Sequence, residues 1–146
     1  MTRPDVNTPW EYLTQVGGPA CAGCLAIGHG LVHALFAVPT PAATGGAPEW
    51  PFAMARSWAI TGAGLDLHVI RAVGLALMSI VIIGFALAAL STVGVLVPPA
   101  WWQATIAVSA IGSAVMLVLF FEPQLVLGLG LDAVLVTIVA TRAWVP

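Results

Sequence analysis

Four long apolar runs, separated by short breaks rich in proline and glycine, dominate the 146-residue chain. The runs cover residues 20–38, 67–97, 101–121 and 125–144. A hydrocarbon layer of about 30 Å is crossed by roughly 20 apolar residues in a helix, which is close to or below the length of each run. Helices are expected because each segment must satisfy its own backbone hydrogen bonds in hydrocarbon. The pattern predicts an all-α fold, an integral membrane four-helix bundle.

Proline residues mark the ends of the runs, at Pro39, Pro41, Pro98, Pro99 and Pro123. Proline has no backbone N–H and its ring clashes with the preceding turn, so helices are expected to stop at these positions. The last two connections are long enough only for antiparallel turns. We therefore expect residues 20–146 to form a single domain, preceded by an N-terminal interfacial segment over residues 1–19.

A longer stretch, residues 40–66, connects the first two runs. Its first half is rich in proline, glycine and alanine. Its second half, residues 52–60, predicts a short interfacial helix between helices 1 and 2. In that helix we expect Arg56 and Ser57 to face water and Trp58 to face lipid.

Composition agrees with lipid as the main solvent of this chain. Hydrophobic residues make up 60% of the sequence and charged residues 7%, and the mean hydropathy is +1.04. A soluble domain carries roughly a quarter charged residues. Lysine is absent and the four basic residues are arginines, so the basic patch of a nucleic-acid-binding protein is excluded. The arginines divide evenly between the two sides of the predicted bundle, so the positive-inside rule gives no orientation.

Ionisable groups inside the apolar runs are the candidate functional residues. At 1.5 Å per residue, counted from the side that carries the 40–66 stretch, His29, Asp132 and Ser113 lie about 13–15 Å deep. His33 is shallower at about 9 Å, and Arg71 is shallower again. Three helices thus bring polar groups to nearly one level. We predict that Asp132 faces inward and bonds His29 or His33, with Ser113 nearby.

Two interpretations of this polar layer remain open. It can be a clasp that fixes the register of the helices, or a site for a ligand, proton or cofactor, as intramembrane charges often are. Haem is not expected, because bis-histidine ligation needs one histidine from each of two facing helices. A metal ion is not predicted either, although two histidines and a carboxylate form a legitimate ligand set. The cofactor, if one exists, is unknown.

The two cysteines form a C-x-x-C pattern, Cys21 and Cys24, at the water-facing start of the first helix. This spacing suits a redox dithiol, but the thioredoxin-like context of such motifs is missing. Two structural cysteines are the preferred interpretation. The pair is expected at the membrane face opposite the polar layer.

Several short motifs resemble one known group of proteins. They are Gly28-His29-Gly30-Leu31-Val32-His33 in the first helix, Ser57-Trp58 with residues 62–64, Arg71-Ala72-Val73-Gly74, and Gly128-Leu129-Gly130-Leu131-Asp132. Together they resemble small bacterial four-helix membrane proteins of uncharacterised function with an H-G-x-x-H first helix, loosely akin to the DoxX-like group. The resemblance covers most of residues 20–146. It implies a four-helix membrane fold but no reaction, substrate or cofactor, and the cysteine pair is not part of it.

Three functional hypotheses follow. The first is a non-catalytic accessory or structural subunit of a larger membrane complex, or of a homo-oligomer, and it is favoured because no complete catalytic set is evident. The second is a DoxX-like protein that handles a quinone, proton or solute through the His/Asp layer. The third is a thiol oxidoreductase that uses the cysteines. The expected location is the bacterial inner membrane with cytoplasmic termini, and enzymatic activity is not expected.

Overall fold

A computed structural model describes residues 22–38, 52 and 57–141 of the chain. These residues form helices joined by turns, and no strand occurs among them, which confirms the all-α prediction for this part of the chain. The predicted N-terminal segment, residues 1–19, lies outside the described residues, as do Cys21 and Arg56. The same is true of the predicted end of the fourth helix, residues 142–144.

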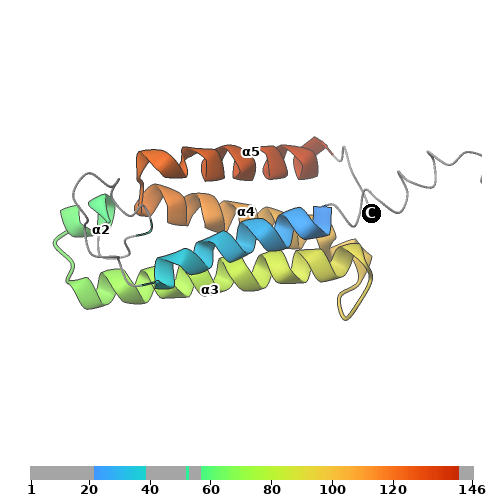
Figure 1. Ribbon diagram of the computed structural model, residues 1–146, viewed down its shortest axis with the longest axis horizontal. Helices are drawn as coiled ribbons and strands as arrows, with labels where there is room; N and C mark the ends of the chain where they lie inside the picture. The colour runs from blue at the N-terminus through green and yellow to red at the C-terminus, as the bar shows by residue number, and fades with distance from the viewer. Residues whose placement is uncertain (1–21, 39–51, 53–56, 142–146) are drawn as a thin grey trace, which may run out of the picture.

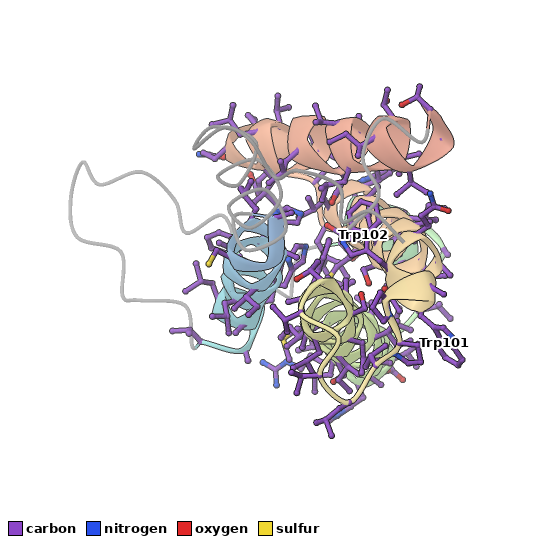
Figure 2. All side chains as sticks on the ribbon, turned by 90° about the vertical axis from the view of Figure 1, so that its right-hand side faces the viewer. Trp101 and Trp102 are labelled. Carbon is purple, nitrogen blue, oxygen red and sulfur yellow. The ribbon has the colours of Figure 1, made fainter. Side chains whose placement is uncertain are left out.

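Four helices run side by side along the long axis of the molecule (Figure 1). The first is Ala22–Ala37, and its last five residues, His33–Ala37, form a 3-10 turn. The other long helices are α3 (Leu67–Thr92), α4 (Trp102–Leu119) and α5 (Val126–Thr141). The shorter elements are α2 (Trp58–Gly62), η2 (Pro99–Trp101) and η3 (Pro123–Leu125). Figure 2 looks along the bundle and shows α5 lying across the first helix and α4.

Three helical segments are long and apolar enough to cross a membrane, judged by length and composition: Leu67–Thr92, Pro99–Leu119 and Pro123–Thr141. The first helix is apolar but shorter. The proline positions explain where the last two segments begin. Pro99 and Pro123 each occupy the first position of a 3-10 turn, where the missing N–H of proline costs no hydrogen bond.

The helix predicted over residues 67–97 is shorter than expected, because α3 ends at Thr92. Its end is a Schellman motif, in which Val95 N–H donates to Leu90 O (3.1 Å) and Gly94 N–H donates to Ser91 O (3.3 Å). Gly94 has a φ of +67°, a backbone conformation that glycine adopts without steric cost. The apolar residues that follow belong to the turn, so hydropathy alone extended the helix too far.

The short helix after the 40–66 stretch also differs from its prediction. It covers Trp58–Gly62 rather than residues 52–60, and Ser57 is buried instead of facing water. Ser57 Oγ accepts from Ile60 N–H (3.3 Å) and donates to Leu119 O (2.7 Å), so it caps α2 and satisfies the end of α4. Trp58 is exposed, and its indole N–H donates to Val118 O (2.7 Å).

Small residues allow the helices to approach each other closely. A Cβ added at Gly30 would lie 2.9 Å from Phe85 Cβ, so this glycine lets the first helix pack against α3. Gly84 has the same role between α3 and α4, where an added Cβ would collide with Ser109. Beyond this contact, Trp102 points into the bundle with 2% of its surface exposed, whereas its neighbour Trp101 points outward (Figure 2).

Candidate functional site

Four polar side chains from three helices meet inside the bundle. His29 and His33 come from the first helix, Ser113 from α4 and Asp132 from α5, and each is at most 8% exposed. We call these four residues the polar cluster. The two histidines are four residues apart and therefore project from the same face of their helix. Asp132 is the one residue of α5 that is fully buried.

The Asp132 carboxyl group is the centre of the polar cluster. Its Oδ1 lies 2.8 Å from His29 Nε2, and its Oδ2 lies 2.6 Å from Ser113 Oγ. Ser113 Oγ is also 2.9 Å from His33 Nε2 and 3.4 Å from His29 Nε2. The carboxyl group therefore connects α5 directly to the first helix and to α4.

The second histidine is oriented by its own helix. His33 Nδ1 donates to the backbone carbonyl of His29 at 3.0 Å, which turns Nε2 toward Ser113. The two imidazole rings meet edge to face with centroids 5.2 Å apart. Phe85 of α3 packs edge to face on His29 at 5.0 Å, and Phe36 stacks on His33 at 6.5 Å. The rings of Phe85 and Phe36 therefore pack directly on the two imidazoles of the polar cluster.

The predicted inward-facing position of Asp132 and its bond to a histidine are confirmed, with Ser113 nearby, whereas Arg71, also a candidate for the polar layer, is not part of the cluster. Asp132 bonds His29, and Ser113 bonds Asp132 and His33. Arg71 is exposed on the second turn of α3, and it takes no part in the hydrogen bonds or the ion pair of the polar cluster.

The predicted thiol pair is described only in part. Cys24 is free and exposed near the start of the first helix, and Cys21 lies outside the described residues. Both thiol interpretations therefore stay predictions. For metals, no group of three or more His, Cys, Asp or Glu side chains in the described ranges has an arrangement that could hold an ion.

A cavity of about 270 Å³ adjoins the polar cluster between the first helix and α5. His29, His33 and Gln124 contribute its polar lining, and the other lining residues are apolar, apart from a glycine. Gly128 lies in the wall one turn before Asp132, where a Cβ would come 2.8 Å from Leu117 Cδ1 and 4.0 Å from His29 Cε1. Neither this cavity nor the contribution of Gln124 to its lining was predicted from the sequence. The only available signal was the polar residue directly after Pro123, at the start of an otherwise apolar run.

Comparisons of the chain with protein-family models, curated proteins and solved structures found no match. The predicted DoxX-like relationship therefore stays a prediction, and the chemistry of the site rests on its own geometry. That geometry offers a buried carboxyl group and two imidazoles beside an apolar cavity. Such an arrangement can accept hydrogen bonds from a small molecule or donate them to it, and protons can move between the carboxyl group and the imidazoles.

Replacing Asp132 tests the polar cluster. We expect Asp132→Leu to lower the free energy of unfolding in detergent by about 1–3 kcal/mol, because His29 and Ser113 lose buried partners. Asp132→Asn keeps an oxygen for His29 and supplies an N–H for Ser113, so it should retain most of the stability. Ala133→Leu, at the exposed neighbouring position, is the matched control. Equal stability of Asp132→Leu and Ala133→Leu would contradict the assigned role of the carboxyl group.

Proposed function

We propose that this protein is an integral membrane four-helix bundle that binds a small amphipathic molecule in the cavity between the first helix and α5. One observation carries the proposal: His29 and His33 belong both to the polar cluster and to the wall of an otherwise apolar cavity. A site with apolar walls and a few convergent polar groups is typical of small-ligand binding.

Membrane insertion is supported by the outer surface of the bundle. Large apolar side chains are exposed along all the long helices, among them Leu31, Ile83, Val108, Ile111 and Leu127. Soluble monomers rarely expose contiguous apolar surface on this scale, whereas hydrocarbon covers it without cost. The described acidic and basic residues outside the polar cluster are Asp66, Arg71 and Glu122, which lie close to helix ends. We extend the proposal to the bacterial inner membrane, with cytoplasmic termini.

Ligand binding is preferred over a purely structural clasp because of the space beside the cluster. A clasp needs only the contacts among Asp132, His29 and Ser113, and close packing around them stabilises it further. Here an apolar cavity lies next to the histidines instead, and Gly128 is part of its wall. Ionisable groups inside a membrane are costly to keep, which favours a function for them. The role as a non-catalytic subunit of a larger membrane complex or homo-oligomer stays a prediction.

Cell fractionation tests the membrane part of the proposal. We expect the full-length chain to sediment with bacterial membranes, to stay there after an alkaline carbonate wash, and to be released by detergent. The physical reason is that exposing the apolar surface of α3, α4 and α5 to water is unfavourable, so this surface stays in the lipid. Release of the chain by carbonate alone would contradict integral insertion.

Blocking the cavity tests the binding part. We expect 1-naphthol to bind the detergent-purified full chain at one saturable site, measured by calorimetry. A Cβ at Gly128 would lie 2.8 Å from Leu117 Cδ1, another side chain of the wall, so a leucine there crowds the cavity beside His29, and Gly128→Leu should weaken binding at least ~tenfold, about 1.4 kcal/mol. Gly130→Leu is the matched control on the same helix, because a Cβ there meets no atom within 4 Å.

Each variant is first checked for helix content and thermal unfolding, so that a loss of binding is read only from folded protein. Equal binding by Gly128→Leu and Gly130→Leu would place 1-naphthol elsewhere and overturn the assignment of the cavity. Absence of saturable binding to the unaltered chain would overturn the proposed function itself.

A further inference from the structure

The protons of the polar cluster can be counted from its geometry. A carbonyl oxygen only accepts, so His33 Nδ1, which lies 3.0 Å from the His29 carbonyl, carries a proton. A hydroxyl group donates one proton, so Ser113 can donate either to Asp132 Oδ2 or to His33 Nε2, but not to both. The third contact, between His29 Nε2 and Asp132 Oδ1, needs a single proton as well.

Two arrangements satisfy all these contacts without a net charge. In one, Ser113 donates to an ionised Asp132 and accepts from a doubly protonated His33. In the other, Asp132 carries a proton on Oδ2 and donates it to Ser113, which donates to a neutral His33. The two interconvert when two protons shift along the path through Ser113. In both arrangements Oδ1 accepts from His29 Nε2–H, and His29 is neutral with no proton on Nδ1.

Every other arrangement of these contacts gives the cluster a net positive charge. A proton on His29 Nδ1 requires either that His29 becomes an imidazolium or that Asp132 donates from Oδ1. In the second case Ser113 must accept from a charged His33. An uncompensated charge in a site at most 8% exposed costs much more than a balanced hydrogen-bond network. Nδ1 of His29 is therefore a hydrogen-bond acceptor.

The ring of His29 lines the cavity. His29 Nε2 is held by Asp132, whereas Nδ1 has no hydrogen-bond partner among the described residues. Within the described part of the chain, Nδ1 is also absent from the fully buried polar atoms that lack a partner, so this nitrogen is not fully enclosed. Because His29 lines the cavity and its Nε2 is held by Asp132, Nδ1 is the nitrogen of this ring that is left for a bound molecule.

We propose that the cavity binds a small lipophilic alcohol or phenol whose hydroxyl group donates a hydrogen bond to His29 Nδ1, an inference that rests on the proposed ligand-binding function. Val32, Leu117 and Leu131 surround the apolar body of the ligand. A molecule of the same shape without a donor leaves the acceptor nitrogen unpaired in an apolar site, and it binds more weakly.

Asp132 acts as a positioning residue in this site. Its carboxyl group keeps the proton of His29 on Nε2, which fixes the tautomer that exposes an acceptor on Nδ1. Histidines whose second nitrogen binds a carboxylate are oriented and made more basic in the same way at other sites. The edge-to-face contact with Phe85 holds the ring from the side of α3.

A matched pair of probes tests the inference with the purified full chain. We compare 1-naphthol with 1-fluoronaphthalene, which is similar in shape but has no hydrogen-bond donor. The ratio of their affinities should favour 1-naphthol in the unaltered chain and fall about tenfold in His29→Phe, which keeps a ring against Phe85. His68→Phe, at an exposed histidine of α3, should leave the ratio unchanged.

Nitrogen-15 NMR of histidine-labelled protein gives a second readout that needs no substitution in the polar cluster. We expect His29 to show a protonated Nε2 and an unprotonated Nδ1, and the Nδ1 signal should shift with 1-naphthol but not with 1-fluoronaphthalene. If His29→Phe does not fold, this measurement alone tests whether the hydroxyl group bonds to His29 Nδ1. In the control variant Gly128→Leu, the shift should require a 1-naphthol concentration at least ~tenfold higher.

The outcomes separate the inference from the function on which it rests. If both probes bind but their ratio is the same in the unaltered chain and in His29→Phe, the hydroxyl inference is overturned while the cavity still binds ligands. A protonated Nδ1 in the resting protein overturns it as well. If neither probe binds the unaltered chain, the inference and the proposed function fall together.

Discussion

The contact between Asp132 and the two neighbouring helices is the interaction on which the bundle depends. α5 fully buries no described residue other than Asp132, and its apolar points of attachment to the core, such as Leu135 and Val139, are only partly buried. The carboxyl group supplies two, His29 on the first helix at 2.8 Å and Ser113 on α4 at 2.6 Å. In the proposed membrane setting the alternative partners are lipid tails, so separating these groups leaves a carboxyl and an imidazole without hydrogen bonds.

The same attachment explains why a cavity lies beside it. α5 approaches the first helix through a polar pair, and the cavity lies beside that pair with Gly128, one turn before Asp132, in its wall. His29 therefore belongs to a hydrogen-bond network on one side and to an apolar cavity on the other. Structural and ligand-binding roles do not exclude each other here, because the bond that joins the helices also fixes which nitrogen the imidazole presents.

The helices and the polar level could be predicted from the sequence because both depend on simple distances. Proline positions and run lengths bound the helices, and a rise of 1.5 Å per residue placed His29, Ser113 and Asp132 at one depth. Three features depend on contacts between segments and were not predictable: the burial of Ser57 against the end of α4, the Schellman turn at Gly94, and the cavity beside Gly128. Arg71 was assigned to the polar layer by depth, and it faces outward because depth does not define the direction of a side chain.

A double-mutant cycle between His29 and Asp132 tests the central claim most directly. The free energies of unfolding of His29→Phe, Asp132→Leu and the double variant are measured in one lipid-like detergent. A direct bond predicts a coupling free energy of about 1 kcal/mol, because the second substitution removes a partner that the first has already lost. Additive effects of the two substitutions would contradict the account and leave α5 without its main attachment to the first helix.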